Sequence, residues 1–237
     1  MSTTLNTPGR LGNQIFRNIC VSILAKKYDL YVQYSEFEKI QRLGIPLYSG
    51  KNIYENSVMI DESRFLHLLK HENELSLNII TGDNYFQTRE ITRIIYDYLE
   101  PIRMRAHPEN NDVFIHLRLD DTADCNPGFK YYDKVLSSLS FTRGYISSDS
   151  PDHEICKQLL EKYPTLEIIQ MDEVNTLLFG SSKKYTILSH GTFSAIIGYL
   201  SNSDVYYPQY NYSIKNTHSD QIFCIPSWIE VECPKTN

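Results

Sequence analysis

The feature that most constrains this chain is a regular alternation of short apolar strands with helical segments in its second half. The pattern begins at Val113-Phe114-Ile115 and ends at Val205-Tyr206-Tyr207, which Pro208 closes. Between these strands, periodicity predicts helices over 131–139, 151–163, 173–179 and 193–200, and strands over 144–146, 166–170 and 185–188. Such alternation is typical of a parallel, doubly wound α/β sheet, in which ligands bind beyond the carboxyl ends of the strands.

The first half of the chain is less regular. Apolar residues recur at helical spacing from Leu11 to Leu24 and predict an amphipathic helix over 13–28. Other patterns predict strands over 30–33 and 74–81, a helix over 91–99, and an irregular stretch over 38–64. The polar, proline-containing segment 105–112 is a candidate linker, so the sequence favours two lobes.

Composition excludes several classes of function. The 237 residues carry a formal net charge of −6 at pH 7, which argues against a generally basic nucleic-acid-binding protein. No apolar run approaches the ~20 residues of a membrane span, and residues 1–8 are too polar for a signal peptide. We therefore expect a cytoplasmic protein without a transmembrane segment. Five cysteines without a CxxC pair favour free thiols over disulfides or a zinc site.

Polar residues concentrate at three junctions that precede helices. The first junction is Gly9-Arg10-Leu11-Gly12-Asn13-Gln14, ahead of the first predicted helix. Its two glycines would let the backbone approach a ligand closely, and a helix N-terminus favours an anion. A plain turn with a helix cap explains the same residues equally well.

The second junction is His116-Leu117-Arg118-Leu119-Asp120-Asp121, directly after the strand 113–115. Residues 116 and 118 share one face of an extended segment, so an imidazole and a guanidinium would project together. Arginine suits a diphosphate because its planar fork donates two hydrogen bonds and stays charged at any working pH. The alternative is a surface arginine paired with Asp120 or Asp121, beside a buried, hydrogen-bonded histidine.

The third junction is Ser189-His190-Gly191-Thr192-Phe193-Ser194, between the strand 185–188 and the helix 193–200. Small hydroxyl-bearing residues and a glycine at a helix N-terminus either cap the helix or hold a phosphate. Taken alone, this junction is explained by ordinary capping.

Taken in order, six segments resemble the glycosyltransferases of family eleven, the α-1,2-fucosyltransferases, and their wider GDP-fucose-using superfamily. GRLGNQIF is similar to the family's G-G-L-G-N-Q-M-F, and HLRLDD to its H-x-R-R-x-D, with His116, Arg118 and Asp121 matching. NYFQT (84–88) resembles G-Y-F-Q-S, and YY (131–132) lies where the family often has paired tyrosines. YISSD (145–149) resembles a strand ending in F-S-D-D, and SHGTFSAIIGYL (189–200) is similar to S-N-S-T-F-S-W-W-A-A-W-L. The six matches are collinear over residues 9–200.

The resemblance implies a GT-B-like α/β architecture, with two Rossmann-like lobes whose parallel sheets face a central cleft. An N-terminal lobe over residues 1–105 would carry the Gly-rich loop and the acceptor. A C-terminal lobe over residues 106–215 would bind the nucleotide-sugar. The segment 216–237 would pack back on the N-terminal lobe, by analogy with other two-lobed transferases.

The resemblance also implies the reaction: inverting, metal-independent transfer of a sugar from a nucleoside-diphosphate donor to a hydroxyl of a glycan acceptor. GDP-fucose is the first expected donor substrate, and no cofactor is expected. The sequence contains no Asp-x-Asp pair, which agrees with a diphosphate held without a divalent ion. Protein cations and dipoles would then stabilise the leaving diphosphate.

Carried over residue by residue, the family's motifs give a candidate site without a metal ligand. Arg118 would meet the charge of the diphosphate, and Asp121 would be the catalytic base or would orient Arg118. The donor-binding residues would be Gly12, Asn13, His116, Arg118, Asp149, Ser189, His190, Thr192, Phe193 and Ser194. Arg10 and Gln14 would reach the acceptor or fix their loop.

Departures from the family pattern leave other functions open. Leu119 stands in place of a second arginine, and Ala195 and Ile196 replace two tryptophans. A changed pocket could hold another donor, such as UDP-xylose, and the same losses fit a non-catalytic glycan-binding module. A nucleotide-dependent oxidoreductase is disfavoured, because segment 9–12 is not followed by the third glycine of the dinucleotide fingerprint.

Overall fold

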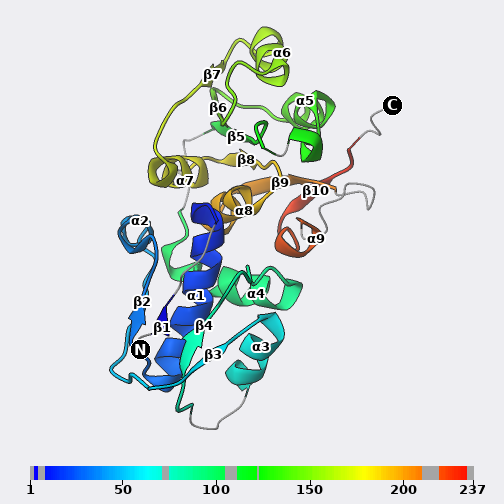
Figure 1. Cartoon of the computed structure of the whole chain (residues 1–237). Helices are drawn as coiled ribbons and strands as arrows, with labels where there is room; N and C mark the ends of the chain where they lie inside the picture. Colours follow the sequence, from blue (N-terminus) through cyan, green and yellow to red (C-terminus); the bar gives the residue numbers. More distant parts are fainter. Residues whose placement is uncertain are drawn as a thin grey trace. The chain divides into compact units, whose positions relative to one another are not determined.

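The computed structural model describes residues 3–4, 9–70, 75–104, 111–121, 123–209 and 219–233 of the chain. The chain divides into two compact units, residues 1–101 and 102–237 (Figure 1). Each unit contains its own parallel sheet. The predicted fold class, α/β with two Rossmann-like lobes of parallel sheets, is confirmed. The sequence predicts the lobe boundary at 105, and residues 105–110 of the candidate linker lie outside the described residues.

The first unit contains a four-stranded parallel sheet with the order β2-β1-β4-β3. Its strands are β1 (Thr3–Thr4), β2 (Val32–Gln33), β3 (Ser57–Met59) and β4 (Asn78–Ile80). Its helices are α1 (Leu11–Tyr28), α2 (Phe37–Arg42), α3 (Glu62–Lys70) and α4 (Arg89–Tyr98), followed by the 3-10 turn η1 (Glu100–Ile102). α1 packs against both α3 and α4, which explains why most of its residues are buried.

Several elements of the first unit differ from the sequence-based expectation. The stretch 38–64, predicted to be irregular, contains most of α2, all of β3 and the start of α3. The strands of this unit have two or three residues each, which is too short for a period of two to be visible. α1 begins at Leu11 rather than 13, so Gly12 lies inside the first helical turn.

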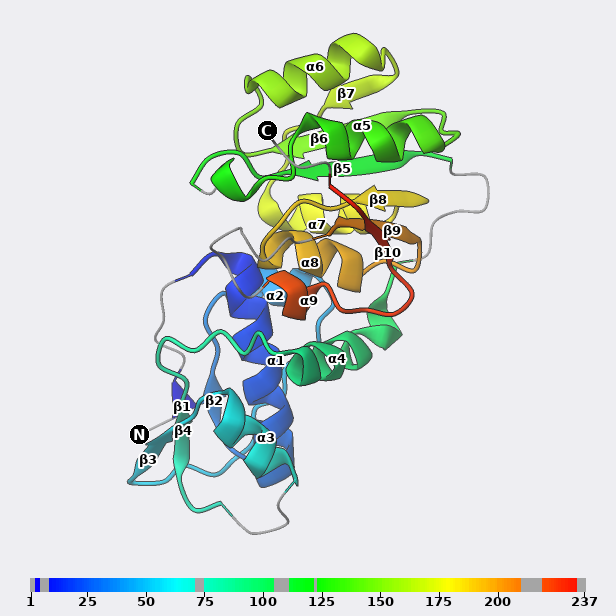
Figure 2. The same cartoon turned by 90° about the vertical axis from the view of Figure 1, so that its right-hand side faces the viewer.

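The second unit contains a six-stranded parallel sheet with the order β10-β9-β8-β5-β6-β7 (Figure 2). Its strands are β5 (Val113–Leu117), β6 (Gly144–Ser148), β7 (Leu166–Ile168), β8 (Tyr185–Ile187), β9 (Asp204–Pro208) and β10 (Ile229–Val231). Its helices are α5 (Phe129–Ser138), α6 (Glu154–Lys162), α7 (Glu173–Ser181), α8 (Thr192–Tyr199) and α9 (Ser219–Ile222), with the 3-10 turn η2 (Ala123–Cys125) before α5. Every strand and helix predicted between residues 113 and 207 is present.

Helices cover both faces of this second sheet. α5 and α6 lie on one side of the strands and α7 on the other, where α8 packs against it (Figure 1). All five residues of β5 are therefore buried. Ile115 joins the core that includes Tyr131 and Tyr132 of α5, whereas Phe114 packs edge-to-face on Phe179 of α7. This alternation places the even-numbered residues of β5 on the α7–α8 face.

The described part of the C-terminal segment belongs to the second unit. β10 pairs in parallel with β9, and Trp228 packs against the rings of Tyr199, Tyr207 and Phe223. An aromatic cluster and a strand edge within the second unit hold residues 223–231, and the expected packing of segment 216–237 on the N-terminal lobe stays a prediction. Among the described residues, no helix is long and apolar enough to cross a membrane.

Candidate functional site

The predicted site residues of the second unit gather where the strand order of its sheet reverses. β5 and β8 are neighbours, but the chain continues from β5 to β6 on one side and from β8 to β9 on the other. Arg118 follows β5, Asp149 follows β6 and Ser189 follows β8. In open α/β sheets this point, at the carboxyl ends of the strands, is where ligands bind.

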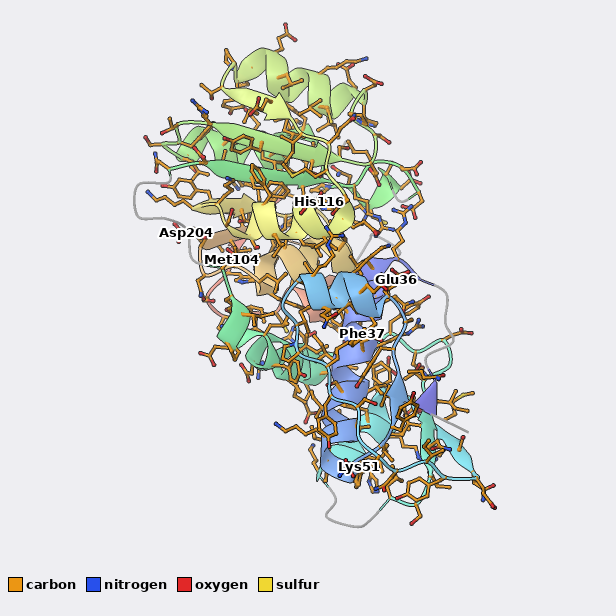
Figure 3. All side chains as sticks on the ribbon, turned by 90° about the vertical axis from the view of Figure 1, so that its left-hand side faces the viewer. Glu36, Phe37, Lys51, Met104, His116 and Asp204 are labelled. Carbon is orange, nitrogen blue, oxygen red and sulfur yellow. The ribbon has the colours of Figure 1, made fainter. Side chains whose placement is uncertain are left out.

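β5 is longer than predicted, and its length decides where His116 lies. The sequence predicts His116 in the loop after the strand, but the structure pairs it with Ser147 of β6, inside the sheet. Figure 3 shows His116 between the strands and the helices on the α7 side of the sheet. Its Nδ1 atom is 3.1 Å from Oγ of Ser194 on α8, and its ring centroid is 5.4 Å from that of Phe193.

Arg118 extends from the end of β5 to the first residues of α8. A Cβ atom added to Gly191, the residue that precedes α8, would be only 2.5 Å from Nη1 of Arg118. The guanidinium therefore lies directly against the N-terminal end of this helix. Gly191 has φ 88° and ψ 165°, a conformation that essentially only glycine adopts.

Asp121 holds the other edge of the same guanidinium. Its Oδ1 atom accepts hydrogen bonds from Nε and Nη2 of Arg118 at 3.2 and 3.1 Å, and its Oδ2 atom accepts from Nη2 at 3.1 Å. The side chains of Arg118 and Asp121 are 20% and 45% exposed. The pairing of Arg118 with Asp121, which the sequence left open, is therefore present in the structure.

Three hydrogen bonds fix the backbone at Arg118 and Leu119. The N–H of Arg118 donates to Oγ of Ser189 at 3.4 Å, and its carbonyl accepts from Nδ2 of Asn126 at 3.2 Å. The N–H of Leu119 donates to Oδ1 of Asp149 at 2.7 Å. Asp149 and Ser189 thus support the loop that carries Arg118.

Asn126 is a site residue that the sequence analysis does not identify. Besides the Arg118 carbonyl, its Nδ2 atom is 3.3 Å from Oγ of Ser189 and 3.1 Å from Oη of Tyr132. Its Oδ1 atom accepts from the N–H of Gly128 at 2.9 Å. Asn-Pro-Gly indicates a turn, which is the only signal for residue 126 in the sequence. The amide joins the loop after β5 to the loop after β8.

Two serines bond the two buried histidines. Oγ of Ser194 accepts from the N–H of Ser189 at 2.9 Å and is 3.1 Å from Nδ1 of His116. Oγ of Ser189, which accepts from Arg118 and Asn126, is 3.2 Å from Nδ1 of His190.

Burial keeps both imidazoles neutral. Burial, followed by the nearby His190 and Arg118, lowers the pKa of His116 to about 3. Burial and Arg118 lower the pKa of His190 to about 4, against the opposing effect of Asp149 and Asp121. Arg118 is therefore the permanent cation of this cluster, and the histidines are neutral hydrogen-bonding groups beside it.

Because the pKa values of these two histidines are lowered by folding, we expect the protein to lose stability in mild acid. Below their ordinary pKa of 6.5 the unfolded chain takes up protons on both imidazoles, whereas the folded chain does so only near 4 and 3. The free energy of unfolding should therefore fall as the pH drops from 6.5, by up to ~1.4 kcal/mol per pH unit for each histidine. Urea titrations between pH 7 and 5.2 measure this slope.

A matched variant isolates the contribution of one histidine. His190→Asn keeps an acceptor near the position of Nδ1 and removes the titrating group, so its slope over the same pH range should be about half as steep. Identical slopes for the wild type and His190→Asn would show that His190 is not the buried, neutral group described here.

Substitution of Gly191 is expected to change both the stability of the protein and the position of Arg118. Gly191→Ala should cost about 1–3 kcal/mol of stability from backbone strain. It should also displace the guanidinium, because the new methyl group overlaps Nη1, and so weaken anion binding. Gly128→Ala is the control: Gly128 has φ 81° and ψ 165° at the start of α5, but nothing lies within 4 Å of its added Cβ atom.

The two alanine variants should therefore lose similar stability but differ in binding. Denaturation curves and titration with inorganic pyrophosphate measure the two quantities separately. Equal affinities of Gly191→Ala and Gly128→Ala for pyrophosphate would contradict the placement of Arg118 against α8.

The remaining predicted residues lie in the first unit, where they make local contacts. Oε1 of Gln14 accepts from Oγ of Ser35 at 2.6 Å, and its Nε2 donates to the Gly9 carbonyl at 3.3 Å. Oδ1 of Asn13 accepts from Nε2 of Gln87 at 3.1 Å. The Arg10 carbonyl accepts from the N–H groups of Asn13 and Gln14, and Gly12 is buried in α1. These contacts fix the entry to α1.

Within the described ranges, no group of three or more His, Cys, Asp and Glu residues is arranged to hold a metal ion. No protein-family model and no curated protein matches the sequence. The fold is similar to E. coli heptosyltransferase WaaC with ADP-2-deoxy-2-fluoro heptose, at 9% identity and a TM-score of 0.48 over 98% of this chain and 93% of that chain. The same enzyme with ADP gives 10% identity and a TM-score of 0.46 over the same shares. The family-eleven resemblance therefore rests on the six sequence segments.

Proposed function

We propose that this protein is an inverting glycosyltransferase that moves a sugar from a nucleoside-diphosphate donor to a hydroxyl of a glycan acceptor. One observation carries the proposal: the guanidinium of Arg118 lies against the N-terminal end of α8, where the strand order reverses. A helix N-terminus is itself positive. Two positive groups side by side are favourable only with an anion between or beside them. The carboxylate of Asp121 is that anion in the structure, and the diphosphate of the donor would be a second one.

The reaction requires the protein to stabilise charge that develops on the leaving diphosphate. Arg118 meets this charge with donors held in a fixed plane, at a position fixed by the backbone hydrogen bonds from Ser189 and Asn126. The neutral imidazole of His116 adds hydrogen-bonding capacity without a second cation. The hydroxyl of Thr192 stands in the first turn of α8, where it can supplement the backbone N–H groups.

Inversion requires the acceptor hydroxyl to attack the anomeric carbon from the face opposite the diphosphate, while a base removes its proton. Asp121 is the predicted base, and both of its carboxylate oxygens accept hydrogen bonds from Arg118. Its role as a base stays a prediction. The sequence without an Asp-x-Asp pair and the cationic diphosphate site support a metal-independent reaction.

The six sequence segments favour GDP-fucose as the donor, with another sugar donor such as UDP-xylose as the alternative. The phosphate site does not depend on this choice, because Arg118 and α8 recognise the diphosphate that both donors contain. Retention of the arginine, the hydroxyls and the helix N-terminus together favours a transferase over a non-catalytic glycan-binding module, for which these groups would have no task.

The test is a thermal-shift panel without added metal, using GDP, UDP, dTDP and CMP with GDP-fucose and UDP-xylose. A ligand that binds only the native state stabilises it by ~2.7 kcal/mol at a hundredfold excess over its Kd. A GDP-selective shift supports a fucosyltransferase. A UDP-selective shift keeps the mechanism and changes the sugar. The absence of a shift with every nucleotide contradicts the proposal and favours the non-catalytic module.

A further inference from the structure

We propose that Asp121 is an internal anion: its carboxylate occupies the Nε–Nη2 edge of Arg118, and a diphosphate that binds this edge displaces it. The inference rests on the proposed diphosphate site at Arg118. It gives Asp121 a role other than that of base, namely setting the affinity of the site for the donor and for the released nucleotide.

Two of the three guanidinium nitrogens of Arg118, Nε and Nη2, donate to Asp121. Arginine has five N–H donors, and its Nε–Nη2 edge is one of the edges that match a carboxylate or phosphate with two parallel hydrogen bonds. Asp121 accepts from this edge through both of its oxygens. Nη1 lies against Gly191 and has no hydrogen-bond partner among the described residues. A bidentate anion on the Nε–Nη2 edge and Asp121 therefore exclude each other.

Exchange of Asp121 for a diphosphate requires only the Asp121 side chain to move. The backbone at Arg118 is held by Ser189 and Asn126, and that of Leu119 by Asp149. The side chain of Asp121 is 45% exposed, and the residue lies in a turn. A rotation of its side chain therefore releases the guanidinium edge while the loop keeps its backbone hydrogen bonds.

Removal of the Asp121 charge changes the anion affinity in a direction that depends on the role of Asp121. If Asp121 competes with the diphosphate, removing its charge strengthens anion binding, because one competitor and one repulsive negative charge are lost. If Asp121 instead orients Arg118 for the diphosphate, removing it weakens binding, because the guanidinium loses its fixed orientation. The two roles thus predict opposite changes in the same measurement.

The experiment is calorimetric titration of the full chain with inorganic pyrophosphate at low ionic strength. Asp121→Asn should bind pyrophosphate about two- to fivefold more tightly than the wild type, the range expected for loss of a partly exposed ion pair. Asp121→Ala should bind pyrophosphate at least as tightly as Asp121→Asn, since asparagine keeps one oxygen that can accept from Arg118 and alanine keeps none. Both variants should fold, because Asp121 is on the surface.

Asp120→Asn is the matched control. Asp120 is exposed and adjacent in the chain, and its substitution removes the same charge. It should leave pyrophosphate affinity nearly unchanged. If Asp120→Asn strengthens binding as much as Asp121→Asn, the effect is one of net charge and the inference is overturned. In an Arg118→Ala background the gain from Asp121→Asn should disappear, because the competition acts through the guanidinium.

The outcomes separate this inference from the proposed function. Wild-type protein that binds neither pyrophosphate nor a nucleotide contradicts the proposed function itself. Binding that depends on Arg118, together with equal or weaker binding by Asp121→Asn, leaves the proposed function in place and overturns the internal-anion role.

Discussion

Replacing Arg118 by alanine is expected to weaken the binding of a nucleoside diphosphate by roughly 10- to 150-fold. The guanidinium is the permanent cation among His116, His190 and the N-terminal end of α8. Hydrogen bonds to a charged group contribute about 1.5–3 kcal/mol, and each 1.4 kcal/mol is a factor of ten in affinity. Calorimetric titration with the nucleotide selected by the thermal-shift panel measures the change.

Arg118→Lys is the matched variant for geometry. It keeps the charge but loses the planar donor edge, so its affinity should lie between those of the wild type and Arg118→Ala. The free energy of unfolding should change by less than about 1 kcal/mol in both variants, because the ion pair with Asp121 is partly exposed. Unchanged nucleotide affinity in Arg118→Ala would contradict the proposed diphosphate site.

Replacing Trp228 by alanine is expected to reduce the free energy of unfolding by about 3–5 kcal/mol. Trp228 is 7% exposed and packs against Tyr199, Tyr207 and Phe223. A Cβ atom added to Gly198 would be only 2.5 Å from the ring of Trp228. Removing the ring leaves a cavity between α8 and the strand β9, which carries Tyr207.

Ile229→Ala is the control for Trp228→Ala, because Ile229 is the next residue and is 41% exposed. Its substitution should cost less than about 1 kcal/mol, since little buried surface is lost. Urea denaturation followed by circular dichroism compares the two variants without relying on tryptophan fluorescence. Similar losses in the two variants would contradict the placement of residues 223–231 in the second unit.

Local patterns were sufficient to predict the strands β5 to β9 of the second sheet, but not its edge strand β10. β5 is buried along its whole length and reads as a short apolar run, and α6 buries Cys156 and Leu159 on one side. Even there, details of the ends escaped prediction. The sequence predicts a helix that begins at residue 151, whereas the helix begins at Glu154, and Nδ1 of His153 caps it by accepting from the N–H of Ile155. Several residues in a row can cap a helix, so their order alone does not decide between them.

The first sheet shows where periodicity fails. The strands that the sequence analysis does not predict are β3, which has three residues, and β1, which has two. A two- or three-residue strand has no repeat to detect. Its place in the sheet depends on which other strands come alongside it, and that information lies elsewhere in the chain.

The sequence by itself determined the type of most elements and the presence of Arg118 and Ser189 just after two strands, because burial patterns and turns are local properties. Only the tertiary structure decided how these residues combine. Asn126 lies 63 residues from Ser189, and Arg118 lies 71 residues from it. Their contacts exist because β5 and β8 are adjacent in the sheet, although the strands β6 and β7 and the helices α5, α6 and α7 lie between them in the chain. Strand order is a collective outcome of packing, which no local pattern of residues encodes.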